Sequence, residues 1–236
     1  MPDQGIILPF YLVVDVSWSM QQSGKLDAAR NILPGVADAL AKNPILNDKV
    51  RFSLIDFSDD ATVLVPLCDL SQQNTLPSLE LRGGTSYGAA FRLLRQQLES
   101  DVTQLRSDGY RVHRPAVFFI SDGEPTDDWK AAFVALTEYD KETGTGFRWY
   151  PVFVPCGVDA ADRDVLRLLV HPPRKSKLYM MKSGVDAAAA IRAMTEVLIS
   201  SVLASGESVA TGGSGLILPG SGDVPADLDV EDDWLS

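Results

Sequence analysis

Apolar runs in this chain alternate with amphipathic stretches, and this pattern predicts a succession of strands and helices. The clearest run, residues 10–14, has five apolar residues in succession, which is typical of a strand buried on both faces. Residues 116–120, with the sequence AVFFI, repeat that pattern. Between these two runs, the apolar positions of residues 87–107 recur every three or four residues, which predicts a helix.

The same patterns give the expected fold. We expect strands at residues 10–14, 50–57, 61–67, 116–120, 148–156 and 177–181, and helices at residues 25–41, 87–107, 126–143, 162–170 and 185–203. Pro66 cannot donate a backbone hydrogen bond, so residues 61–67 are expected at an edge, antiparallel to residues 50–57. The predicted fold is α/β: a doubly wound, mostly parallel sheet of about six strands, with one antiparallel edge strand and helices on both faces.

The composition changes after residue 204. Residues 205–236 are rich in Gly, Ser, Pro and acidic residues and contain no Lys or Arg. The chain has a formal net charge of −11, and most of it comes from the acids that follow Arg192, where no basic residue balances them. Such a segment buries too little apolar surface to fold alone. We therefore expect one domain at residues 1–204 and a flexible Gly/Ser-rich acidic tail at residues 205–236.

The overall composition narrows the class of protein. A net charge of −11 and a sequence pI of about 4.6 argue against nucleic acid as the main partner. No apolar run approaches the roughly 18 residues that a membrane span needs. Residues 1–5 lack the basic segment of a signal peptide, and Cys68 and Cys156 lie in apolar segments where they are expected to pack as small hydrophobic side chains. These features predict a cytoplasmic protein without a membrane span.

Oxygen-bearing side chains follow the predicted strands. Asp15, Ser17 and Ser19 come directly after the first strand, Thr85 lies in the glycine-rich loop before the helix at 87–107, and Asp122 follows the strand at 116–120. Ligands of open α/β sheets bind where parallel strands end, so these side chains are expected to meet. Oxygen donors without nearby His or Cys suit Mg²⁺, with Mn²⁺ or Ca²⁺ also possible. The alternative for the first group is a polar turn that caps a helix.

These motifs carry a family resemblance. The series Asp15-x-Ser17-x-Ser19, Gly84-Thr85 and Ser121-Asp122-Gly123 resembles the metal-ion-dependent adhesion site of von Willebrand factor A domains. The resemblance extends over roughly residues 6 to 204. It is closest to the bacterial TerY-type branch, which is associated with tellurite resistance and stress response, because of residues 8–11 and 121–129. Trp18 departs from the small residue that is usual at its position.

The resemblance implies how the site works. Ser17, Ser19 and, with a ligand bound, Thr85 would coordinate the cation directly, while Asp15 and Asp122 would act largely through water. The cation would then accept an Asp or Glu carboxylate from a partner protein, such as a kinase or phosphatase of the same system. Three further residues are candidates for a partner-binding rim, with packing as their alternative role: Trp18, Tyr87 and Glu124.

Two other functions are alternatives to this one. A Mg²⁺-dependent phosphoryl-transfer or hydrolytic enzyme is the first, but the chain has no Gly-x-x-x-x-Gly-Lys-Ser/Thr loop and no Gly-x-Ser-x-Gly elbow. Its two histidines, His113 and His171, lie in connections away from the metal loops. No catalytic residue is therefore predicted. The second alternative is a scaffold whose site no longer binds metal.

The acidic tail suggests a ligand within the chain itself. It carries several carboxylates beside Trp234 and Leu235, which is the combination of acid and apolar anchor that an adhesion-type site would bind. A tether raises the effective concentration to the millimolar range, so a weak motif would compete. The hypothesis is that an acid among residues 227–233 occupies the metal site of the same or a neighbouring molecule.

Overall fold

A sheet of eight strands forms the centre of the molecule, whose computed structural model describes residues 5–213 and 215–232. The strand order is β3-β2-β1-β5-β6-β7-β8, and the short β4 pairs with the start of β1. β3 and β8 run antiparallel at the two edges, and the pairs between them are parallel. The strands are β1 (Ile6–Asp15), β2 (Val50–Phe57), β3 (Ala61–Cys68), β4 (Arg111–Val112), β5 (Ala116–Ser121), β6 (Val152–Gly157), β7 (Leu178–Met181) and β8 (Leu228–Glu231).

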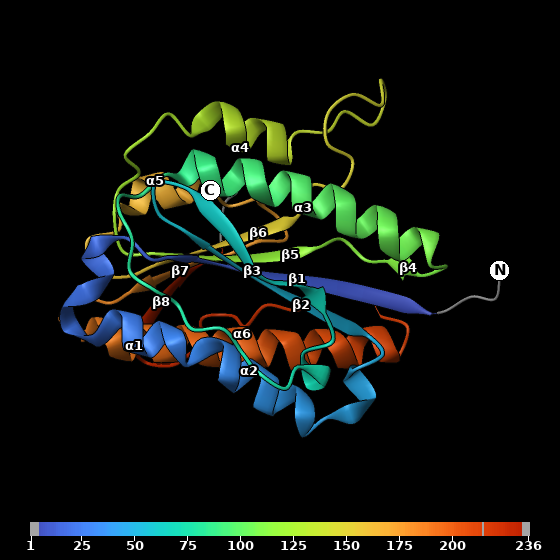
Figure 1. Ribbon diagram of the computed structural model, residues 1–236, viewed down its shortest axis with the longest axis horizontal. Helices are drawn as coiled ribbons and strands as arrows, with labels where there is room; N and C mark the ends of the chain where they lie inside the picture. Colours follow the sequence, from blue (N-terminus) through green and yellow to red (C-terminus); the bar gives the residue numbers. More distant parts are fainter. Residues whose placement is uncertain (1–4, 214, 233–236) are drawn as a thin grey trace.

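Helices cover both faces of this sheet. Figure 1 shows α3, α4 and α5 over one face and α1, α2 and α6 over the other. The α-helices are α1 (Lys25–Arg30), α2 (Ile32–Ala41), α3 (Tyr87–Ser107), α4 (Lys130–Thr137), α5 (Arg163–Leu168) and α6 (Ala187–Ala210). Short 3₁₀ helices occur at Trp18–Gly24, Pro44–Leu46 and Leu70–Gln72.

Alternation along β1 explains why the sheet needs both helical layers. Phe10, Leu12 and Val14 belong to the core shared with α1, α2 and α6. Tyr11 and Val13 belong to the core under α3 and α4. Because successive side chains of a strand point to opposite faces, an uninterrupted apolar run requires a cover on each side.

The predicted fold class is confirmed, with a sheet larger than expected. β3 is the antiparallel edge strand that Pro66 indicated. The two additional strands are β4, which is only two residues long, and β8, which comes from the segment expected to be a tail. β8 pairs antiparallel with β7, so the sheet has a second antiparallel edge strand where one was predicted.

The described part of the C-terminal segment packs on the domain, unlike the flexible tail expected at residues 205–236. Helix α6 continues to Ala210, past the predicted boundary at residue 204. Ser205, buried in this helix, hydrogen-bonds through Oγ with the backbone N of Ile217 at 2.8 Å. Leu228 is buried in the core. These contacts and the pairing of β8 with β7 hold the segment on the domain. The composition of the segment does not reveal them.

Helix α6 is the one helix in the described ranges whose length and hydropathy would also suit a membrane span. Its apolar residues lie in the core against the sheet and pack with α1 and α2. The apolar character of α6 is therefore accounted for by packing within the domain.

Candidate metal centre

Three loops meet at the carboxyl edge of the sheet. β1 ends at Asp15, and the neighbouring parallel β5 ends one residue before Asp122. The third loop, at residues 82–86, leads into α3. A Cβ placed on Gly123 would lie 3.8 Å from Thr85 Oγ1 and 3.9 Å from Ser19 Oγ. The hydroxyls of the loop after β1 and of the loop at residues 82–86 therefore lie near the same point on the loop after β5, as the sequence predicted.

A continuous chain of hydrogen bonds links the two carboxylates. Asp15 accepts from the backbone N of Ser17 at 2.9 Å and from Ser121 Oγ at 2.7 Å. Ser17 Oγ and Ser19 Oγ lie 2.8 Å apart, and Ser19 Oγ donates to Asp122 Oδ1 at 2.6 Å. The structure thus brings Asp15, Ser17, Ser19 and Asp122 into one network. Thr85 Oγ1 faces it without a hydrogen bond to any described residue.

The glycines of the loop at residues 82–86 let Asp59 pack closely against it. The backbone N of Gly84 donates to Asp59 Oδ1 at 2.9 Å. A Cβ on Gly83 would lie 1.6 Å from Asp59 Oδ2, so a larger residue there would displace the Asp59 side chain. Ser86 then caps α3 by accepting from the backbone N of Ala89 at 3.1 Å. These contacts fix the position of Thr85 between the loop and the helix.

The site is buried on one side and open on the other. Asp15, Ser17, Thr85 and Asp122 are all buried, whereas Ser19 is exposed. Burial raises the pKa of Asp15 to about 6, against hydrogen bonds from Ser17 and Ser121 that favour the ionised form. A ligand would therefore approach the cluster from the side of Ser19.

Two charged residues of this cluster were not predicted from the sequence. Lys25, at the start of α1, is buried, and its Nζ lies 2.5 Å from Asp122 Oδ2 and 2.7 Å from Asp159 Oδ2. Burial works against its charge, but the hydrogen bonds with both carboxylates prevail and raise the pKa of Lys25. Asp159 follows β6 at the same edge and has a positive φ of 53°. The available signals were an acid just after a buried strand and a lysine at the start of an apolar helix.

The predicted rim residues differ from one another in exposure. Trp18 has 61% of its surface exposed, and Glu124 is also exposed. Tyr87 is buried at 1% exposure, and its hydroxyl donates to the backbone O of Gly123 at 3.0 Å. It packs edge-on against Phe57 and Phe119. The prediction of a rim role for Tyr87 is therefore corrected, because its ring belongs to the core and supports the Asp122 loop from below.

The donor set fits a hard divalent cation. Ser17, Ser19 and Thr85 supply neutral hydroxyl oxygens, and Asp15 and Asp122 supply carboxylates that are already anchored by the protein. Nowhere in the described ranges do three or more His, Cys, Asp or Glu side chains form a metal-binding group by themselves. Oxygen ligands of this kind suit Mg²⁺, Mn²⁺ or Ca²⁺ rather than a soft metal.

The acids of the C-terminal segment lie elsewhere. Glu231 pairs with Arg163 at 2.5 Å and with Arg167 at 2.7 Å, and Asp229 lies 3.4 Å from Arg163. Asp232 pairs with Lys177 at 3.1 Å. In this structure these three acids are held by cations and do not join the hydrogen-bond network of the metal centre. Residues 233–236, including Trp234 and Leu235, lie outside the described residues.

Comparison with known proteins agrees with this geometry. Residues 10–124 match the family model of the von Willebrand factor type A domain. The matched range contains all five predicted metal ligands. The predicted α/β fold of that domain is the fold observed. Comparison with curated protein sequences found no match.

Several solved structures share the fold at low sequence identity. A von Willebrand factor type A protein from Catenulispora acidiphila is 13% identical with a TM-score of 0.56, over 84% of this chain and 43% of its own. The pilus adhesin SpaC from Lactobacillus rhamnosus GG, in its open conformation, is 16% identical with a TM-score of 0.58, over 84% and 30%. Proximal thread matrix protein 1 from the mussel byssus, solved with zinc in its adhesion motif, is 16% identical with a TM-score of 0.51, over 86% and 47%. The chain spans less than half the length of each.

Proposed function

We propose that this chain is a metal-dependent protein-binding module that docks an Asp or Glu side chain of a partner. The observation that carries the proposal is the convergence of Ser19 Oγ and Thr85 Oγ1 beside the anchored carboxylate of Asp122. A hard cation held mostly by neutral hydroxyls keeps much of its positive charge, and such cations readily add a carboxylate ligand. When bound, it would supply an electrophilic position for that carboxylate.

The surface beside the site suits a protein partner. Trp18 projects from the metal loop with 61% of its surface exposed. Its backbone N donates to the O of Gly83 at 3.2 Å, which joins two of the three loops. An exposed aromatic side chain next to a polar site is typical of residues that anchor an interface. Glu124 adds a negative charge to the rim and would favour a partner with a cation near its acid.

The cellular setting is proposed from sequence resemblance alone. The likeness of residues 8–11 and 121–129 to the TerY-type branch suggests a cytoplasmic stress-response system linked to tellurite resistance. Its partners would be proteins with an acidic motif, such as a kinase or phosphatase of that system. Asp227 and its neighbouring acids remain candidates as ligands in a neighbouring molecule.

A binding role is favoured over catalysis by the position of the histidines. His113 borders a cavity at the opposite edge of the sheet, and burial lowers the pKa of His171 to about 4. Neither histidine hydrogen-bonds to the metal centre. We therefore propose no general base among them and no catalytic role for the chain.

A metal-dependent affinity capture tests the proposal. Immobilised protein in Mg²⁺ should retain partners that EDTA releases, and an Asp15→Ala/Ser17→Ala column should not retain them. Replacing the partner's acidic residue at the mapped contact by its amide should abolish capture. A retained set that is the same with EDTA, or the same on the variant column, would contradict the proposal. Lys42→Ala, which changes an exposed residue of α2's C-cap, serves as the control column.

A further inference from the structure

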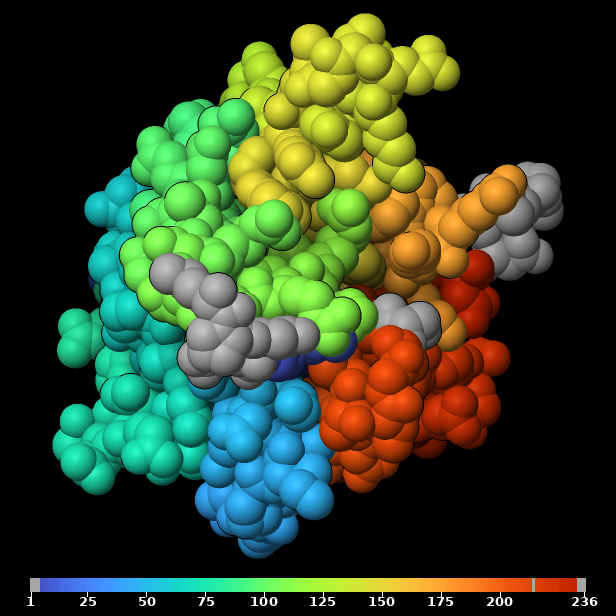
Figure 2. Space-filling model, turned by 90° about the vertical axis from the view of Figure 1, so that its right-hand side faces the viewer, coloured from blue at the N-terminus to red at the C-terminus, as the bar shows by residue number. Residues whose placement is uncertain are grey.

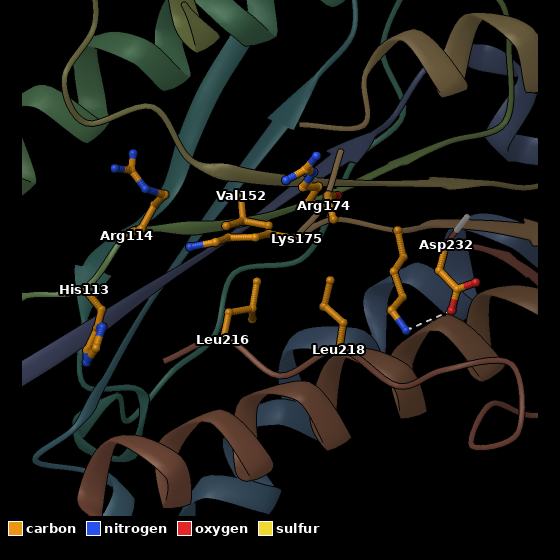
Figure 3. A pocket seen from close by; sticks show the side chains of 10 residues that line it. His113, Arg114, Val152, Arg174, Lys175, Leu216, Leu218 and Asp232 are labelled. Atoms are coloured by element: carbon orange, nitrogen blue, oxygen red, sulfur yellow. Dashed lines mark hydrogen bonds and ion pairs between the residues drawn. The ribbon is translucent and has the colours of Figure 1, made fainter. Parts of the chain in front are cut away.

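The amino edge of the sheet carries a cavity. A cavity of about 460 Å³ lies between the loops that enter β5, β6 and β7 and the C-terminal segment. Figure 3 shows Arg114, Val152 and Lys175 on one side and Leu216 and Leu218 on the other. This volume is in the range of pockets that hold small organic molecules.

The cavity is cationic in an acidic protein. Arg114, Arg174, Lys175 and Lys177 line it, although the chain carries a net charge of −11. Its lining includes one acid, Asp232, which pairs with Lys177 at 3.1 Å. Arg174 and Lys175 are exposed and form no ion pair with any described residue. Two positive charges are therefore available to an anion.

One cation is already held in position. Arg114 stacks its guanidinium 3.7 Å from the ring centroid of Tyr150 and donates to the backbone O of Tyr150 at 2.6 Å. Its side chain is half-buried. A guanidinium fixed in this way loses little further freedom when it binds an anion, which favours recognition of a phosphate or carboxylate.

The apolar floor is also fixed. Two hydrogen bonds hold the C-terminal segment. The backbone N of Ile217 donates to Ser205 Oγ at 2.8 Å, and the Tyr179 hydroxyl donates to the backbone O of Pro219 at 2.8 Å. Gly215 has a φ of +99°, and a Cβ there would lie 3.0 Å from His113 Nδ1, so glycine lets the segment pass close to the cavity wall. Leu216 and Leu218 thus form a stable apolar surface. Figure 2 shows this side of the molecule, where the orange loop before β7 borders the red C-terminal segment.

We propose that this cavity binds a small amphipathic organic anion. Its phosphate or carboxylate group lies against Arg114, Arg174 and Lys175, and its hydrocarbon body lies on Leu216 and Leu218. A small molecule fits better than a polyanion because a cavity of about 460 Å³ suits a small organic ligand, and the chain as a whole, with a net charge of −11, repels an extended negative chain. The site is separate from the metal centre, which lies at the other end of the same strands.

The test is calorimetric titration of the whole chain in EDTA with octyl phosphate, octanoate and inorganic phosphate. One-to-one binding of at least one octyl compound is expected, about tenfold or more tighter than inorganic phosphate, which cannot use the apolar floor. The preferred headgroup separates the phosphate from the carboxylate source. Arg174→Gln/Lys175→Gln should weaken binding about tenfold or more.

The matched control is Lys130→Gln/Lys141→Gln, which removes the same charge from exposed positions outside the cavity. It should leave the affinity unchanged, and both variants should keep the circular dichroism spectrum of the parent. No binding of either octyl compound would overturn the proposal, as would equal weakening by the control pair. Because EDTA is present throughout, the result does not depend on the metal centre.

Discussion

The two edges of one sheet carry opposite chemistry. At the carboxyl edge, hydroxyls and carboxylates converge around one buried lysine, Lys25. At the amino edge, cations surround a cavity that contains one acid, Asp232. The carboxyl edge is assembled from loops within the predicted domain, whereas the amino edge is completed by the C-terminal segment. Motifs that directly follow strands are therefore visible in the sequence, whereas a site completed by a distant segment is not.

The largest effect is expected from Lys25→Met. Removing the ammonium leaves Asp122 buried without its cation, and breaking such a pair costs about 3 to 5 kcal/mol of unfolding free energy without metal. The same loss of positive charge should tighten Mg²⁺ binding about tenfold. Denaturant unfolding with and without Mg²⁺ measures both effects. Lys42→Met, in an exposed pair with Asp38, should change stability by less than about 0.5 kcal/mol. Equal losses in the two variants would contradict the role given to Lys25.

The variant Leu228→Ala tests the packing of the C-terminal segment that completes the amino edge. Leu228 is buried in β8, so its truncation should cost about 2 to 4 kcal/mol and release the C-terminal segment. Limited proteolysis should then cut within residues 211–227 while the remaining domain stays folded. Ile217→Ala, at a side chain with 42% exposure in the same segment, is the control and should have a small effect. Rapid cleavage of the parent chain in this segment would show that the segment is not packed.

Asp15, at the carboxyl edge, should make the stability of the metal-free protein depend on pH. Because burial raises the pKa of Asp15 to about 6, the folded state holds its proton more tightly than the unfolded state. This contribution is fully present below pH 4 and is lost as the pH rises through about 6. As the pH falls from 7 to 4, protonation of Asp15 should raise the unfolding free energy by up to about 2 kcal/mol. The pKa of His171 is lowered to about 4 in the folded state, so this residue lowers the unfolding free energy as the pH falls over the same interval.

The two contributions are separated by single variants. Asp15→Asn should remove the gain at low pH, so its stability should fall more steeply than that of the parent as the pH decreases from 7 to 4. Urea unfolding at several pH values in EDTA measures this. Parallel curves for Asp15→Asn and the parent would show that Asp15 does not titrate as the geometry implies.

The smallest effect on stability is expected from Trp18→Ala. Its side chain is largely exposed, so unfolding free energy should change by about 0.5 kcal/mol or less, and Mg²⁺ affinity should not change. Retention of metal-dependent partners should nevertheless fall. Glu124→Gln provides a milder change at the same rim. Full retention by Trp18→Ala would remove this residue from the proposed interface.

Sequence patterns predicted most of the fold and the five oxygen donors because those features are local. The apolar run at residues 10–14 and the polar residues that follow it are adjacent, and parallel pairing of β1 with β5 brings Asp15 and Asp122 together. Lys25 and Asp159 were missed because their contact joins α1 to the loop after β6. Tyr87 was predicted at the rim because it follows Thr85 closely in the sequence. Proximity in sequence does not show that its side chain points into the core. The packing of residues 215–232 depends on Ser205 and the edge of β7, which the composition of the segment does not show.

Calorimetric titration of Mg²⁺ into metal-free protein, beside the Asp15→Ala/Ser17→Ala variant, measures directly whether the carboxyl edge binds a cation. We expect one-to-one binding by the parent chain, no binding by the variant, and the same folded circular dichroism spectrum for both. Mn²⁺ and Ca²⁺, titrated in the same way, would rank the cations. Absence of binding by the parent chain, or equal binding by the variant, would contradict a metal centre at the carboxyl edge of the sheet.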